Sequence, residues 1–124
     1  ILALMFKDAS DFNGSLNSWD VSNVTVTSGM FNGAESFNQS INSWNVSNVT
    51  DMRKMFKEAE SFNQPLNSWD VSNVNDMINI LTGASSFYQD LSMWCVEQHP
   101  QRGEFNLPEN LPPDFHPDWG ASCD

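Results

Sequence analysis

The sequence predicts an α/β repeat protein: a solenoid with a parallel sheet on one face, short helices on the other, and a C-terminal cap. Tryptophan recurs every 25 residues, at Trp19, Trp44, Trp69 and Trp94. In each 25-residue unit, one segment has the alternating pattern of a strand and the next has the apolar spacing of a helix. We expect residues 1–94 to hold the repeats, the first one truncated, and residues 95–124 to form the cap.

The predicted strand lies around each tryptophan. Leu66, Trp69 and Val71 have the L-x-x-L-x-L spacing of a leucine-rich repeat, with Trp and Val in two of the leucine positions. The alternation over residues 69–72 is the period-two pattern of a short strand with one buried face. The predicted fold class is therefore a leucine-rich-repeat solenoid, in which stacked units align their strands in a parallel sheet.

The predicted helix follows each strand. Met52, Met55, Phe56 and Ala59 fall at positions i, i+3, i+4 and i+7, which form one face of a helix. Neither a lone strand nor a two-turn helix is stable alone, so we expect stacking to bury a continuous core of Leu, Trp, Val, Met and Phe.

The C-terminal section departs from the repeat and contains five of the six prolines. We expect it to cover the last apolar layer with Val96, Phe105, Leu107, Leu111, Phe115 and Trp119. Cys95 and Cys123, the only cysteines, bracket it. A disulfide between them is the first hypothesis, and it would indicate an oxidising compartment. Two buried free thiols, or a metal site with His99 and His116, are the alternatives.

Composition excludes several classes of function. Five basic against sixteen acidic side chains give a net charge of −11, which argues against nucleic acid as a partner and against attachment to an anionic membrane. No apolar run reaches the roughly 20 residues of a membrane span, so we expect no membrane insertion. Both histidines lie in the Pro-rich cap and no catalytic arrangement surrounds them, so we predict no enzyme activity.

No cofactor and no metal site are predicted. Calcium is kept only as an alternative, because Asp20 and Asp70 lie two units apart with Asn45 between them and do not converge on one ion.

The unit from Met55 to Val74, M-F-K-E-A-E-S-F-N-Q-P-L-N-S-W-D-V-S-N-V, resembles the BspA-type leucine-rich repeat of surface proteins. Trp94-Cys95-Val96 and the closing Pro117-x-Trp119-Gly120-x-x-Cys123 are similar to the C-terminal ending of that family. The resemblance implies an exported or cell-surface protein with a role in adhesion or ligand binding and no enzyme activity.

The outward columns of the predicted sheet are the candidate ligand-binding residues. They are Ser18, Asp20, Ser22, Ser43, Asn45, Ser47, Ser68, Asp70 and Ser72. The alternative is a solvated face that only keeps the repeat soluble. A column after the strand, Asn23, Asn48 and Asn73, is expected to be a structural ladder that satisfies backbone groups. Asn13 and Asn38, each followed by x-Ser in a loop, are candidate glycosylation acceptors.

Together these features predict an extracellular or cell-surface module for adhesion or for protein or glycan binding. The partner would lie on a host, a matrix or a neighbouring cell. The alternative is a structural repeat whose copies stack into a surface fibre or layer through an open N-terminal end. We expect such an open end because the sequence starts in the middle of a unit.

Overall fold

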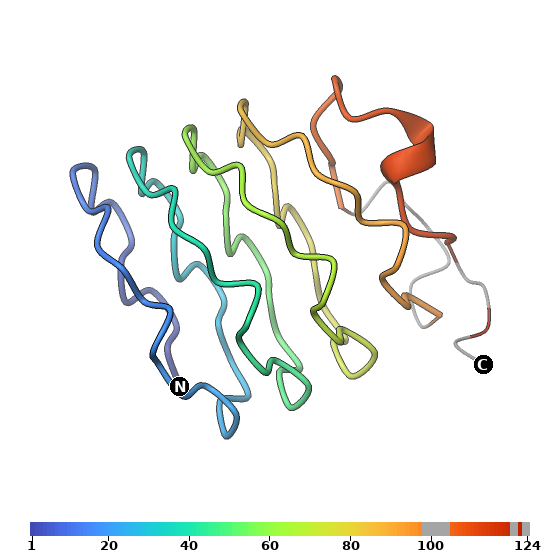
Figure 1. Cartoon of the computed structure of the whole chain (residues 1–124), viewed down its shortest axis with the longest axis horizontal. Helices are drawn as coiled ribbons and strands as arrows, with labels where there is room; N and C mark the ends of the chain where they lie inside the picture. Colours follow the sequence, from blue (N-terminus) through green and yellow to red (C-terminus); the bar gives the residue numbers. More distant parts are fainter. Residues whose placement is uncertain (98–104, 120–121, 123–124) are drawn as a thin grey trace.

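The computed structural model describes residues 1–97, 105–119 and 122. Similar coils of the chain lie side by side in a row, with the N-terminus in the first coil and the C-terminal section at the opposite end (Figure 1). Isolated parallel bridges join Val26 to Asp51 and Asp51 to Asp76, so equivalent residues of successive coils lie 25 positions apart. We call the coils layers 1 to 4, beginning at residues 1, 26, 51 and 76.

The prediction of a parallel sheet backed by short helices is wrong. Among the described residues there is no α-helix, and strand pairing is limited to the two isolated bridges. The one regular element in that part of the chain is the 3₁₀-helix η2, Pro113–Phe115. Each layer is built of turns and irregular backbone, and the chain is therefore not a leucine-rich-repeat solenoid of the sheet-and-helix kind.

The segment predicted as a strand consists of two β-turns. In layer 3, the Trp69 amide donates to the Leu66 carbonyl and the Val74 amide donates to the Val71 carbonyl, both at 3.1 Å. Asparagine and serine occupy the centres of both turns, and these residues favour turns because their side chains bond to nearby backbone. A chain that turns back every four residues cannot extend into a sheet, although its apolar side chains still face inward.

The segment predicted as a helix bonds mainly to the next layer. The amides of Met52, Lys54, Phe56 and Glu58 donate to carbonyls 24 residues ahead, at 2.7–3.0 Å. Between them, the amides of Met55 and Lys57 donate to the carbonyls three positions earlier, both at 3.2 Å, and the Arg53 amide donates to the Asp51 side chain at 3.1 Å. An α-helix needs each amide to bond four residues back, so this pattern excludes one.

Left-handed residues recur in this segment and enforce the turns. Lys54 and Glu58 have φ of 55° and 57°, and the same column in layer 2 holds Gly29 with φ of 62°. A left-handed residue every four positions interrupts right-handed helical backbone.

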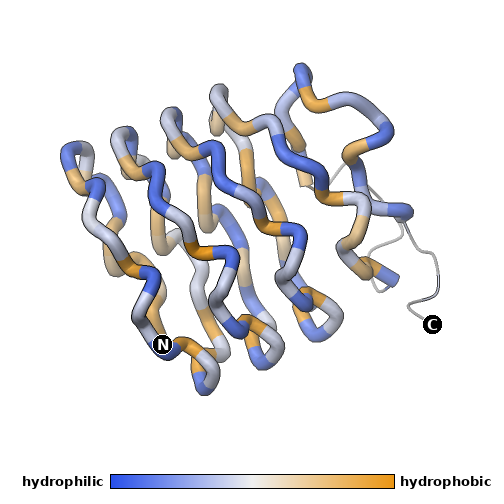
Figure 2. The backbone as a smooth tube through the Cα atoms, viewed as in Figure 1, coloured by the Kyte–Doolittle hydropathy of each residue, from blue (hydrophilic) through white to orange (hydrophobic). Residues whose placement is uncertain are grey.

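The predicted apolar core is confirmed. The Trp, Val, Leu or Ile, Met, Phe and Ala columns are almost completely buried in layers 2 to 4. Phenylalanines stack between layers, with ring centroids of Phe31 and Phe56 5.5 Å apart and those of Phe37 and Phe62 5.9 Å apart. The hydrophobic positions recur at matching places along the row of coils (Figure 2). The i, i+3, i+4, i+7 pattern thus correctly marked the buried residues, but it marked them in a series of turns.

The predicted covering role of the C-terminal section is also confirmed for the residues named. Val96, Phe105 and Leu111 are buried, and Leu107, Phe115 and Trp119 pack against the core. The Leu91 amide donates to the Phe115 carbonyl at 2.8 Å, which ties this section to layer 4. The division of the chain at residue 95 itself stays a prediction.

Candidate recognition surface

The predicted binding residues lie on the paired turns of layers 1 to 3. We call residues 16–24, 41–49 and 66–74 together the turn edge. Backbone bonds from Thr50 to Thr25 and from Asn75 to Thr50, each 2.8 Å, hold these segments in register. The structure therefore brings the three copies of the predicted residues together, but on a row of turns rather than on a sheet.

Each copy of the turn edge carries the same local hydrogen bonds. In layer 1, an Asp20 carboxylate oxygen accepts from the Ser22 amide at 3.0 Å and from the Ser22 hydroxyl at 2.6 Å. Asn45 makes the equivalent bonds with Ser47, and Asp70 makes them with Ser72. The acidic or amide side chain caps the following turn and is held in one orientation while it stays exposed.

The hydrogen bonds from Ser22 lower the pKa of Asp20 below its ordinary value of 3.8, with the hydroxyl bond as the larger cause. Ser92 lowers the pKa of Asp90 in the same way. The carboxylate form of Asp20 is therefore stabilised, and the turn edge presents a fixed negative charge there at neutral pH.

The Asn column beside these residues bridges the layers. The Asn48 side-chain amide donates to the Ser22 carbonyl, and that of Asn73 donates to the Ser47 carbonyl, both at 2.7 Å. Asn23 lies in the same column of layer 1. These bonds act on backbone groups of the previous layer and fix the spacing between copies of the turn edge.

A second bridge lies at the outer side of the first turn. The Ser43 hydroxyl donates to the Asn17 side chain at 2.9 Å, and the Ser68 amide donates to the Asn42 side chain at 3.1 Å. Ser43 and Ser68 remain exposed. Two of the predicted binding residues therefore also take part in the stacking of the layers.

Sequence reasoning missed the tryptophan ladder. The indole Nε1 of Trp44, Trp69 and Trp94 donates to the carbonyl of Leu16, Ile41 and Leu66 respectively, at 2.9–3.0 Å. These carbonyls belong to buried residues, and each also accepts the amide that closes its own turn, at 3.1 Å. The indole adds a second bond, between layers, which explains why tryptophan stands where a leucine-rich repeat has leucine. The invariance of Trp in all four units was the signal.

A third ladder involves the candidate glycosylation acceptors. The Asn13 side-chain oxygen accepts from the Asn38 amide at 2.8 Å, and that of Asn38 accepts from the Asn63 amide at 2.9 Å. Gln39 and Gln64 donate to the same oxygens at 3.2 and 3.0 Å. The recurring Asn-Gln pair marks this ladder. Glycosylation of Asn13 and Asn38 stays a prediction, on side chains already engaged between layers.

The predicted disulfide and the alternative metal site include residues outside the described part of the chain. Cys123 and His99 lie outside the described residues, so the Cys95–Cys123 disulfide stays a prediction. Within the described ranges, no three His, Cys, Asp or Glu side chains gather closely enough to hold a metal ion. The same part of the chain has no helix with the length and apolar character of a membrane span.

The cavities in the described part of the chain include two that open on its surface. The larger, about 700 Å³, lies between layer 4 and the C-terminal section, beside Gly83 and Pro108. The smaller, about 460 Å³, crosses layers 1 to 3 on the segment that was predicted to be helical. We call the second cavity the basic groove, because its lining includes Lys7, Arg53 and Lys54.

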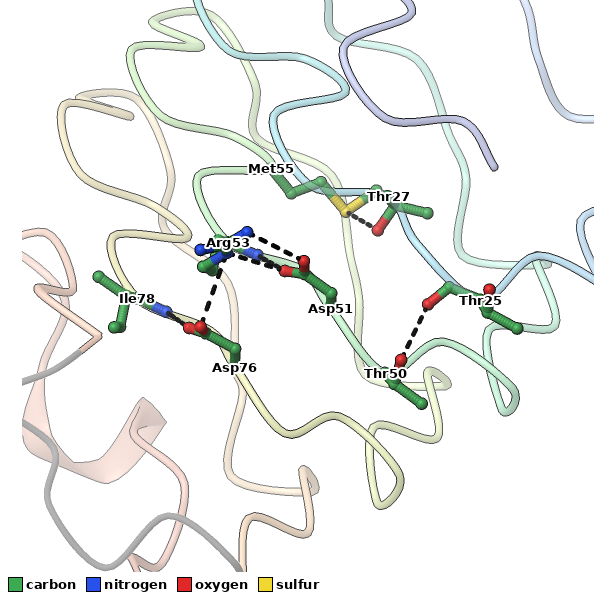
Figure 3. A network of polar contacts seen from close by, with 8 residues as sticks. All are labelled: Thr25, Thr27, Thr50, Asp51, Arg53, Met55, Asp76 and Ile78. Carbon is green, nitrogen blue, oxygen red and sulfur yellow. Dashed lines mark hydrogen bonds and ion pairs between the residues drawn. The ribbon is translucent and has the colours of Figure 1, made fainter.

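Arg53 lies at one side of the basic groove and is oriented by two acids. Its guanidinium contacts the Asp51 carboxylate at 3.3 Å and the Asp76 carboxylate at 3.6 Å (Figure 3). Asp51 and Asp76 are the residues of adjacent layers that the isolated bridge pairs.

No curated protein and no solved structure matches the chain. Residues 1–106 match a family described as a Mycoplasma protein of unknown function, DUF285. The match covers most of the sequence and includes all four layers. We conclude that this chain belongs to the DUF285 family.

Proposed function

We propose that the chain is a non-enzymatic recognition module of the cell surface or extracellular space. It would bind a protein or glycan on a host, a matrix or a neighbouring cell through the turn edge. Its resemblance to BspA-type surface repeats supports this proposal. The observation that carries it is the turn edge itself: three copies of one polar turn, exposed, capped and held at a fixed spacing.

Repetition favours avidity rather than one tight contact. Trp19 is 37% exposed in layer 1, but the equivalent Trp44 and Trp69 are buried. Exposed aromatic side chains, which usually dominate a tight protein interface, are therefore not repeated along the turn edge. Several weak contacts at fixed spacing bind more strongly together than singly, because the later contacts form at high effective concentration. A repeated ligand, such as a matrix protein or a polymeric glycan, fits such a surface.

The test uses Asp20→Asn with Asp70→Asn. Asn45 makes the same capping bonds at the equivalent position of layer 2, so this double variant removes two charges while keeping the turns. The labelled chain and its variant are compared for attachment to cultured cells and to immobilised matrix proteins and glycans. We expect attachment of the unaltered chain to be saturable and the variant to attach at least several-fold more weakly.

Glu35→Gln with Glu60→Gln is the matched control. Both glutamates are exposed and lie outside the turn edge, and the change in net charge is identical. Equal loss in the two double variants would show an effect of net charge alone and would reject the turn edge. Absence of saturable attachment by the unaltered chain would reject the function.

A second candidate is a structural role in which copies stack end to end. It is supported by the apolar side chains that layer 1 leaves exposed: Ile1 is 86% exposed, Leu4 56% and Met5 51%. Light scattering after size-exclusion chromatography distinguishes the two. Concentration-dependent growth that Met5→Glu abolishes would favour stacking, and a monomer at high concentration would reject it.

A further inference from the structure

The basic groove crosses a column in which layer 2 has glycine and its two neighbours have large side chains. Gly29 stands between Leu4 and Lys54 in one column, and all three are left-handed, with φ of 62°, 61° and 55°. A Cβ at Gly29 would come within 2.6 Å of the Leu4 side chain. The Leu4 side chain therefore lies over Gly29, where layer 2 has no side chain of its own.

The charge of the groove is opposite to that of the chain. Three of only five basic residues line it, in a protein with a net charge of −11. A positively charged hollow attracts an anionic group.

The nearby acids leave part of this charge available. Arg53 is held by Asp51 and Asp76, which orient it and partly neutralise it. Lys7 contacts only the adjacent Asp8, at 3.5 Å, and that carboxylate is 72% exposed, so the pair is weak. Lys54 forms no ion pair within the described part of the chain. Lys7 and Lys54 therefore offer two ammonium groups from opposite sides of the hollow.

The remaining lining indicates which kind of anion fits. Ser28 and Asn32 add a hydroxyl and an amide, which bond to hydroxyl groups. Leu4 gives an aliphatic surface over Gly29. A volume of about 460 Å³ lies in the range of small-molecule sites. Cations, hydroxyl partners and an aliphatic wall together match the carboxylate, hydroxyl groups and C–H face of an acidic sugar.

The geometry points to the basic groove as a binding site for a carboxylated saccharide, such as a short chain of uronic acid units. This inference rests on the proposed recognition function and names a ligand class for it at a second surface, distinct from the turn edge. Lys7 and Lys54 bind the carboxylates, and Asn32 bonds to ring hydroxyls.

Titration calorimetry and amide NMR with tetragalacturonate test the site. We expect saturable binding with chemical-shift changes at Gly29, Asn32 and Lys54. Lys54→Gln and Lys7→Gln should each raise the Kd about tenfold. Two variants are used so that the site can still be tested if one of them fails to fold. Lys57→Gln is the matched control, because Lys57 lies on the same segment but does not line the groove. It should change the Kd less than twofold.

Three outcomes would overturn the site: no binding of tetragalacturonate, equal weakening by Lys57→Gln, or equal affinity for a tetra-aspartate peptide or for sulfate. Maltotetraose, which is neutral, should not bind, and binding as tight as that of tetragalacturonate would contradict the role of the lysines. If tetragalacturonate does not bind but cell attachment still depends on Asp20 and Asp70, the saccharide site in the groove is rejected and the proposed function is not. Absence of saturable cell attachment by the unaltered chain, with intact saccharide binding, would reject attachment through the turn edge and leave the groove supported.

Discussion

Replacing Trp69 with phenylalanine tests whether the tryptophan ladder stabilises the stack. The indole Nε1 of Trp69 donates to the Ile41 carbonyl at 3.0 Å, and both residues are buried. Phenylalanine keeps most of the ring but removes the donor, so the Ile41 carbonyl keeps only the Trp44 amide, which donates to it at 3.1 Å.

The expected loss has two parts. Loss of one hydrogen bond to a carbonyl that keeps a second donor costs about 0.5–1.5 kcal/mol. The smaller ring gives up about 40 Å² of buried apolar surface, or about 1 kcal/mol at roughly 25 cal/mol per Å². We therefore expect Trp69→Phe to lower the free energy of unfolding by about 1.5–2.5 kcal/mol.

Trp19→Phe is the matched control, because the sequence change is the same in the same column. Trp19 is 37% exposed, and its Nε1 donates to no group in the described part of the chain. We expect it to cost less than about 1 kcal/mol. Guanidinium unfolding followed by circular dichroism measures both, with equal m-values required for the comparison. Equal losses in the two variants would refute the hydrogen-bonded ladder.

Three further predictions concern backbone strain, pH and the cap. Glu58→Gly should raise the free energy of unfolding by about 0.5–1 kcal/mol, because glycine adopts the left-handed φ of 57° without strain and the entropic cost of glycine is smaller than that strain. Thermal melting measures the change, and a lower melting temperature would show that Glu58 is not strained. Ser22→Ala should raise the pKa of Asp20 toward 3.8. The stability that the Ser22 bonds give is present above pH 3.8 and is lost as the pH falls through the lower folded pKa. Carboxyl NMR titration measures the midpoint, and an unchanged value would count against the hydroxyl bond. Reduction of a Cys95–Cys123 disulfide should destabilise the chain by about 3–4 kcal/mol. An unchanged melting temperature under reducing conditions would show that these cysteines form no disulfide.

The columns of apolar residues could be predicted, because burial depends on side-chain chemistry and on a period that is visible in the sequence. Trp44, Phe56 and Leu66 are buried as expected. The side-chain amides of Asn48 and Asn73 donate to backbone carbonyls of the preceding layer, as expected for a structural ladder of asparagines. The turn edge was correctly gathered from residues 25 positions apart, although it was assigned to strands.

The basic groove could not be predicted. It depends on Gly29 lying beside Leu4 and Lys54 in space, although each of them is 25 positions away from Gly29 in the chain. The sequence shows a weak helix former at that position, but the hollow appears only when layers 1 and 3 are placed on either side.

By itself the sequence determined the 25-residue period, the buried columns and the covering of the last layer. The tertiary structure decided the path of the backbone within each layer. The spacing of Met52, Met55, Phe56 and Ala59 suits one face of a helix and equally suits a series of turns. What separates the two is where each amide finds its acceptor. In the stack, carbonyls of the next layer lie within reach of Met52, Lys54 and Phe56, and those bonds replace the helical ones.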